Sequence, residues 1–145
     1  MPFKFPLATV LRVREIVEKR EERALQAIQL EMAQVLRKVE ELSAEITQRQ
    51  TAREVALRQP IPAAQLQMLL WTTQAAVEKK DALLRHLQTL EKRRDQQMTL
   101  YKVAHRNRET LTEMADKQRS AFELEEARLL QKSLDDLFIA RRHRS

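Results

Sequence analysis

The sequence has no glycine and no cysteine, and it has only four prolines and 4% aromatic residues. Without cysteine the chain has no disulfide framework, which fits a reducing compartment. Without glycine it cannot form the glycine-rich loops that cradle phosphates in P-loop and dinucleotide-binding proteins. No apolar run approaches the ~18 residues of a membrane span, and the N-terminal segment lacks the apolar core of a secretory signal. We therefore expect a cytoplasmic protein without a nucleotide site of these types.

The spacings of a catalytic or metal site are also missing. The three histidines, His86, His105 and His143, lie far apart, and neither His-x-x-x-His nor Glu-x-x-His occurs. Neighbouring carboxylates such as Glu40 and Glu41 would point in different directions on a helix, so they do not form an acid–base pair. We expect no enzyme, no catalytic residue, no metal, no cofactor and no small-molecule ligand.

The residues that dominate instead are Ala, Glu, Lys, Arg, Leu and Gln, which lose little entropy in a helix. The only strong break after Pro6 is Gln59-Pro60-Ile61-Pro62, because proline lacks a backbone N–H and clashes with the preceding turn. This pattern predicts an all-α fold with two long helices in an antiparallel coiled-coil hairpin, the second helix overhanging the first. The predicted bounds, within one domain of residues 1–145, are helix one about 6–58, turn 59–62 and helix two about 63–142.

Hydrophobic spacing supports the hairpin. In helix one, apolar residues recur at steps of three and four, as in a left-handed coiled coil: Leu25, Ile28, Met32, Val35, Val39, Leu42 and Ile46. With the chain turning at residues 60–61, antiparallel partners have residue numbers that sum to about 121. This register places apolar residues of helix two opposite most of those positions. The predicted seam of helix two is Leu66, Leu69, Thr73, Ala76, Lys80, Leu83, Leu87, Leu90, Arg94, Gln97, Tyr101, Ala104 and Leu111, and helix one opens with Leu7, Val10, Leu11 and Val17.

The overhang of helix two has its own apolar face. In this register the N-terminal end of helix one lies opposite about residue 115 of helix two. The remaining roughly 25–30 residues of helix two, or ~40 Å of helix, then have no partner helix in the chain. Apolar side chains of this overhang fall on one broad face: Phe122, Leu129, Leu130, Leu134, Leu137 and Phe138. An amphipathic helix that nothing covers indicates docking to another surface. A frayed end or a self-dimer is the alternative.

A second apolar group lies just after the turn. Met68 and Trp71 are not seam positions, and Trp71 should face away from helix one. Tryptophan is enriched in the parts of interfaces that contribute most to binding. The alternative, given equal weight, is that Trp71 folds back over Pro60-Ile61-Pro62 and caps the turn.

The net charge of +6 raises the question of nucleic acid as a partner. Basic clusters occur at Lys92-Arg93-Arg94, at Arg106 and Arg108, and at Arg141-Arg142-His143-Arg144. However, no aromatic residues are interleaved with these clusters, and glutamates interrupt any continuous positive stripe. Nucleic-acid binding is therefore the third hypothesis, and a generic coiled-coil adaptor or homodimeric scaffold is the second.

The first hypothesis comes from a resemblance. Phe3-Lys4-Phe5-Pro6-Leu7, followed by Val10-Leu11-Arg12-Val13-Arg14-Glu15, resembles the start of the FliJ family of flagellar export proteins. Length, composition, two-helix pattern and basic C-terminal end are similar as well, although stalk proteins of injectisome-type secretion would look much the same. The resemblance implies a cytoplasmic coiled coil of the flagellar type III export apparatus, peripheral at the inner face of the cell membrane.

The resemblance also implies partners. Family members resemble the central stalk of rotary ATPases, and they are thought to insert a terminal end into the hexameric export ATPase. They also contact the cytoplasmic domain of the export gate and handle substrate-specific export chaperones. Carried onto this chain, the ATPase-facing end comprises Leu7, Leu11 and Arg14 together with the overhang Phe122, Leu129, Leu130, Leu134, Leu137 and Phe138. The gate-facing segment comprises Met68, Leu69, Trp71, Thr73 and Ala76.

Overall fold

The chain is all-α, as predicted. The computed structural model describes residues 2–144, and these form helix α1 (Ala8–Ala56) and helix α2 (Ala63–Arg144), with no strand in that range. Strong helix formers and the absence of glycine and of internal proline explain why each helix continues for so long. In particular, α2 continues through residues 105–108 without a break.

The proline turn ends one helix and starts the next. At the end of α1 the bonds tighten to three-residue spacing: the amides of Arg58 and Gln59 each donate, at 3.3 Å, to the carbonyls of Val55 and Ala56. Across the turn, the Pro62 carbonyl accepts hydrogen bonds of 3.1 Å from the amides of Gln65 and Leu66. Proline cannot donate a backbone hydrogen bond, so the first turn of α2 is a position where it costs nothing.

The chain divides into two compact units, and both helices pass through both of them. Unit 1 comprises Met1–Glu21 and Tyr101–Ser145, and unit 2 comprises Glu22–Leu100. In each unit a segment of α1 pairs with a segment of α2, and the helix–helix contacts are those of an antiparallel hairpin. That residues 1–145 form one domain stays a prediction.

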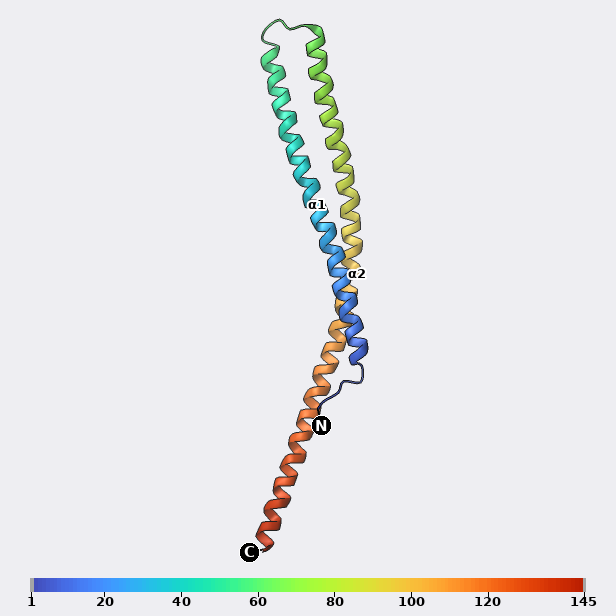
Figure 1. Ribbon diagram of the computed structural model, residues 1–145, viewed down its shortest axis with the longest axis vertical. Helices are drawn as coiled ribbons and strands as arrows, with labels where there is room; N and C mark the ends of the chain where they lie inside the picture. The colour runs from blue at the N-terminus through green and yellow to red at the C-terminus, as the bar shows by residue number, and fades with distance from the viewer. Residues whose placement is uncertain (1, 145) are drawn as a thin grey trace. The chain divides into compact units, whose positions relative to one another are not determined.

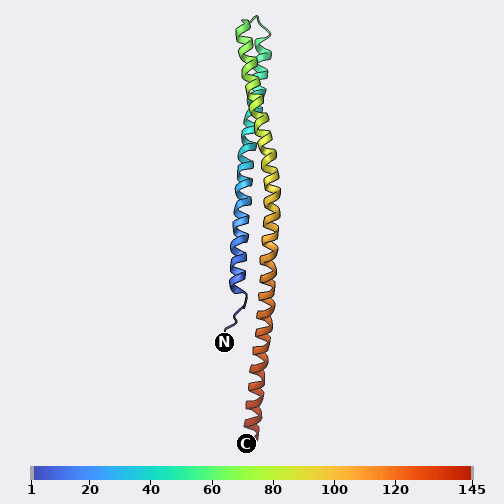
Figure 2. The same cartoon turned by 90° about the vertical axis from the view of Figure 1, so that its right-hand side faces the viewer.

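Unit 2 is held by an apolar seam between two helix segments that run side by side to the proline turn (Figure 1, Figure 2). Its central cluster brings together Ile28, Met32, Val35, Val39, Leu83, Leu87 and Leu90, and Leu90 is fully buried. The predicted register therefore holds here, since Val35 and Val39 share one core with Leu87 and Leu83. All seven heptad residues of helix one are buried: Leu25, Ile28, Met32, Val35, Val39, Leu42 and Ile46.

Unit 1 is packed more loosely. Among its described hydrophobic residues only Ala104 is buried, while Leu11, Val17 and Leu111 are half-buried. Leu7 and Val10 are 37% and 44% exposed, so the prediction that they belong to a buried seam is wrong. The segment before α1 lies along α2 instead, as Figure 1 shows.

Candidate partner-binding surfaces

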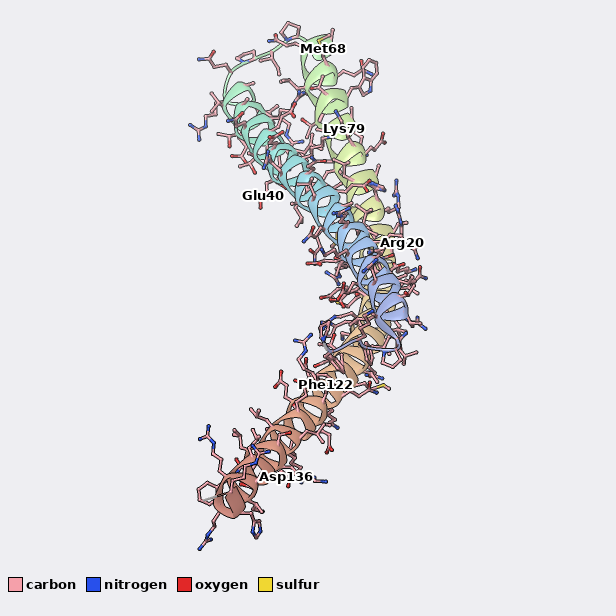
Figure 3. The ribbon with its side chains drawn as sticks, turned by 60° about the horizontal axis from the view of Figure 1, so that its bottom comes forward. Arg20, Glu40, Met68, Lys79, Phe122 and Asp136 are labelled. Carbon is pink, nitrogen blue, oxygen red and sulfur yellow. The ribbon has the colours of Figure 1, made fainter. Side chains whose placement is uncertain are left out.

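The C-terminal end of α2 has a stripe of leucines. We call residues 123–144 the tail; every one of them is exposed, and no second helix of unit 1 lies beside them (Figure 3). Leu130, Leu134 and Leu137 follow each other at helical steps of four and three, so they share one face, and they are 64%, 52% and 62% exposed. We call these three residues the tail stripe. Two shallow grooves border it, one lined by Glu123, Glu126, Ala127, Leu129, Leu130 and Ser133 and the other by Leu134, Leu137, Phe138 and Arg141.

The tail stripe does not continue the seam that α2 shares with α1. In unit 1 that seam runs through the half-buried Leu111, Ala115 and Phe122, and the same spacing would next reach Leu129. The stripe begins one residue later, at Leu130, which corresponds to a rotation of about 100° around the helix. The broad apolar face expected from the sequence is therefore two neighbouring faces.

Phe122 belongs to the first of these faces and has a partner within the chain. Its ring lies 5.5 Å from the ring of Phe3, centroid to centroid, at an interplanar angle of 46°. The guanidinium of Arg119 lies 5.8 Å from the centre of the Phe3 ring, in a cation–π arrangement. The expectation that Phe122 is part of an uncovered surface is therefore wrong. The signal that could have found this contact is the pair of phenylalanines just before Pro6.

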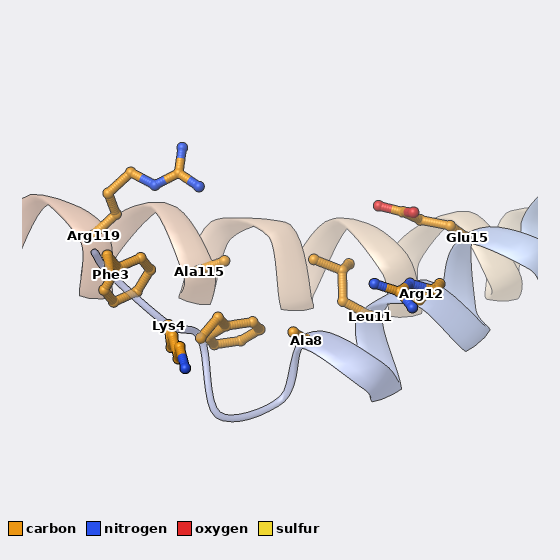
Figure 4. A pocket seen from close by; sticks show the side chains of 9 residues that line it. Phe3, Lys4, Ala8, Leu11, Arg12, Glu15, Ala115 and Arg119 are labelled. Atoms are coloured by element: carbon orange, nitrogen blue, oxygen red, sulfur yellow. The ribbon is translucent and has the colours of Figure 1, made fainter. Parts of the chain in front are cut away.

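A groove lies between the N-terminal segment and α2 (Figure 4). We call the contact of Phe3 with Phe122 and Arg119 the N-terminal clasp. The groove is lined by Phe3, Lys4, Phe5, Ala8, Leu11, Arg12, Glu15, Ala115 and Arg119. Of the three residues predicted for docking in this region, Leu11 lines the groove, whereas Leu7 and Arg14 are exposed outside it. The structure thus brings Leu11 together with the clasp, and not with the tail stripe.

A half-buried ion pair joins α1 to α2 in unit 1. Nε of Arg108 donates to Oε2 of Glu18 at 2.5 Å, and Nδ1 of His105 lies 3.5 Å from Oε1 of Glu18. The Glu18 side chain is only 16% exposed. Hydrogen bonding from Arg108 lowers the pKa of Glu18 below its ordinary value, although burial acts in the opposite direction. The same bond raises the pKa of Arg108. Sequence reasoning missed this pair because it treated Arg108 as part of a basic cluster.

The predicted gate-facing residues divide between two faces of α2. Met68 and Trp71 are each 66% exposed, so Trp71 does not cap the turn, and the alternative reading of that residue is wrong. Leu69 and Thr73 are half-buried, and the Thr73 hydroxyl donates to the Leu69 carbonyl at 2.8 Å. Ala76 is buried in the unit 2 seam. Of these five residues, only Met68 and Trp71 therefore offer largely exposed side chains. Figure 3 shows Met68 near the proline turn.

Within residues 2–144 no His, Cys, Asp and Glu side chains gather in a group that could hold a metal ion. No helix in that range has a stretch long and apolar enough to cross a membrane.

Two of the basic clusters contribute arginines to ion pairs inside the chain, since Arg108 binds Glu18 and Arg94 lies 3.2 Å from Asp95.

Comparison with protein families gives one informative result. The family model described as "Flagellar FliJ protein" matches residues 3–145, which is almost the whole sequence. Comparisons with curated proteins and with solved structures give no match.

Proposed function

The chain belongs to the flagellar FliJ protein family and is thus a component of flagellar type III protein export, and we propose that it serves there as a central stalk for the export ATPase. In this role the tail enters the hexameric ATPase ring. Met68 and Trp71 contact the cytoplasmic domain of the export gate, and the helices also receive substrate-specific chaperones. Contact with the gate would hold the protein at the inner face of the membrane.

The exposed tail stripe is the observation that supports this proposal most directly. Three leucines, each more than half exposed, occupy one face of a helix that unit 1 does not cover. Exposing a contiguous apolar face to water is unfavourable, and such faces usually mark sites of protein–protein contact. A single helix with a narrow apolar stripe can fit into a groove or a central opening of a partner.

ATP hydrolysis by the cognate export ATPase tests this docking. We expect the purified chain to increase the hydrolysis rate, and we expect the double variant Leu130→Asp with Leu137→Asp to lose the increase, because a charge on the stripe must be desolvated on docking. Ile139→Asp is the matched control: Ile139 is 52% exposed and lies on the opposite side of the same helix. Circular dichroism should show equal helicity for all three proteins. Equal stimulation by the stripe variant and the control would refute the proposed docking surface.

The proposed gate contact rests on the exposure of Met68 and Trp71. An indole ring and a flexible thioether, both on the outer face of α2, are suited to a shallow apolar site on a partner. Leu69, Thr73 and Ala76 face the intrachain seam, so they would support the gate contact indirectly by packing α2 against α1. We therefore expect substitutions at these three positions to affect the gate contact only through the packing of unit 2.

Fluorescence of Trp71, the only tryptophan of the chain, tests the gate contact without a label. Titration with the cytoplasmic domain of the gate should change the emission, and Met68→Asp should weaken the apparent affinity about tenfold or more, as expected for a contact at the centre of an interface. Leu30→Asp in α1 is the control, because Leu30 is 63% exposed in the same unit and lies outside the proposed surface. An affinity that falls equally for both variants would contradict the assignment.

A further inference from the structure

The tail carries a heptad pattern of its own, separate from the seam with α1. Six residues of the tail, which we call the ladder, recur at steps of four and three: Glu123, Ala127, Leu130, Leu134, Leu137 and Arg141. This spacing places every ladder residue on the same side of the helix, as in a helix of a coiled coil. The two grooves of the tail lie along this ladder, one at its acidic end and one at its basic end.

The ladder is complementary to itself when it is reversed. In an antiparallel pair of tails, Leu130 of one copy faces Leu134 of the other. The next layer outward puts the small Ala127 opposite the large Leu137, and the outermost layer puts Glu123 opposite Arg141. Each of the six layers therefore pairs two large residues, a small residue with a large one, or an acid with a base. A two-fold axis relates the two halves, as it does in most protein dimers.

The positions that flank the ladder agree with the same arrangement. Leu124 and Phe138 are 57% and 67% exposed, and the tail stripe does not include them. In the antiparallel register, Leu124 of one copy lies beside Phe138 of the other, so both large side chains leave water. Gln131, whose amide donates to Asp135 at 3.2 Å in its own chain, then lies at the two-fold axis beside its own copy.

A parallel pair of tails would be opposed by charge. It would set Glu123 against Glu123 and Arg141 against Arg141, and like charges at seam positions discriminate between coiled-coil orientations. The tail is also long enough, because its 22 residues span about 33 Å, and isolated helices are marginal only below ~12–15 residues. We propose that the tail of this chain pairs with the tail of a second copy as an antiparallel coiled coil.

This inference stands independently of the ATPase proposal. Both use Leu130, Leu134 and Leu137, so a tail paired with a second copy cannot enter a ring at the same time. The self-pairing would thus keep the leucines covered until a partner displaces the second copy. The experiments that test it contain no ATPase, so either proposal can fail without the other.

Disulfide trapping tests whether the two tails run antiparallel. Because the sequence has no native cysteine, only the introduced cysteines can form a cross-link. One full-length chain carries Ala127→Cys and another carries Leu137→Cys, and both are placed in a glutathione redox buffer. A disulfide needs Cα atoms within ~7 Å, and identical positions lie about 15 Å apart in the antiparallel pair because ten residues separate them. We expect a cross-linked dimer when the two chains are mixed and little when either is alone. Cross-linking of each chain alone, or none in the mixture, would overturn the proposal.

Sedimentation of cysteine-free chains tests the charge pairing without a cross-link. The unmodified chain should form a dimer whose dissociation constant lies in the range of about 1 µM to 1 mM. Glu123→Arg alone and Arg141→Glu alone should each weaken it about five- to tenfold, because both outer layers then hold like charges. A mixture of these two variants should recover the dimer, since opposite charges meet again in both layers. Ile139→Asp should behave like the unmodified chain. A monomer at every concentration, or no recovery in the mixture, would reject the antiparallel register.

Discussion

Unit 2 and unit 1 use the same two helices, but they hold them together by different forces. In unit 2, a regular ladder of buried apolar residues surrounds the fully buried Leu90. In unit 1 the only buried hydrophobic residue among those described is Ala104. There Glu18 and Arg108 join α1 to α2, and the N-terminal clasp joins the segment before α1 to α2. Apolar burial needs no charged group and so depends little on pH, whereas an ion pair requires both of its charges and is weakened by salt screening. The difference indicates that unit 2 provides the stability and that unit 1 can open at lower cost.

The largest expected effect is in the core of unit 2. Leu90→Ala should lower the free energy of unfolding by about 2–5 kcal/mol, because a fully buried leucine leaves a cavity that its neighbours fill only in part. Urea unfolding followed by circular dichroism measures this change. Leu30→Ala is the control, since Leu30 is 63% exposed, and its cost should stay within about 0.5 kcal/mol. Equal stability of the two variants would contradict the conclusion that the apolar seam of unit 2 provides the stability.

A smaller effect is expected at the ion pair of unit 1. Near neutral pH, Glu18→Gln should ease the opening of unit 1 by about 1–2 kcal/mol, because Arg108 loses a charged partner that is mostly shielded from water. Hydrogen exchange of the backbone amides in unit 1 measures this opening, and amides of unit 2 should be unchanged.

The same variant gives a test by pH. The pKa of Glu18 in the folded chain lies below its ordinary value of 4.5, so the folded state binds fewer protons than the unfolded state near that pH. Its stabilising contribution is therefore complete above about pH 4.5 and is lost as the pH falls through the lowered folded pKa. The difference between the unmodified chain and Glu18→Gln should vanish in acid. Glu113→Gln, which removes an exposed carboxylate of unit 1, is the control and should leave the opening of unit 1 near neutral pH unchanged.

The smallest effect is expected at the N-terminal clasp. Phe3→Ala removes the ring that packs on Phe122, a contact of the kind worth about 0.5–1.5 kcal/mol. Cleavage by trypsin after Lys4 should become about two- to tenfold faster, because cleavage follows the population of the open segment. Mass spectrometry identifies the first cut. Leu7→Ala should leave the rate unchanged, since Leu7 is outside the clasp, and an equal acceleration would argue against a specific clasp.

The sequence predicted unit 2 better than unit 1, and the reason is physical. A heptad ladder is a local, periodic signal, and it correctly identified every buried residue of α1 from Leu25 to Ile46. The prolines of the turn were equally informative, because their effect on the backbone is local too. The contact between Glu18 and Arg108, by contrast, joins residues 90 positions apart. Charged residues occur throughout both helices, so no pattern distinguishes that pair from its solvated neighbours.

The candidate surfaces were predicted in part for the same reason. The outward position of Trp71 and the exposure of the three stripe leucines follow from helical periodicity. Periodicity did not decide whether the Trp71 ring covers the turn, and the structure shows that it is exposed. The pairing of Phe3 with Phe122 does not, because the segment before α1 has no periodicity and its path depends on where it meets α2. Leu129 shows a further limit: it is apolar and exposed, but it continues the intrachain seam and lies outside the tail stripe.

The one-residue offset between the intrachain seam and the tail stripe has a consequence for how this helix could evolve. Substitutions at Leu130, Leu134 or Leu137 can change the proposed contact of the tail stripe without loosening the pairing of α1 with α2. Substitutions at Leu111, Ala115 or Phe122 can change that pairing and leave the tail stripe intact. Two kinds of selection can thus act on adjacent turns of one helix with little interference between them.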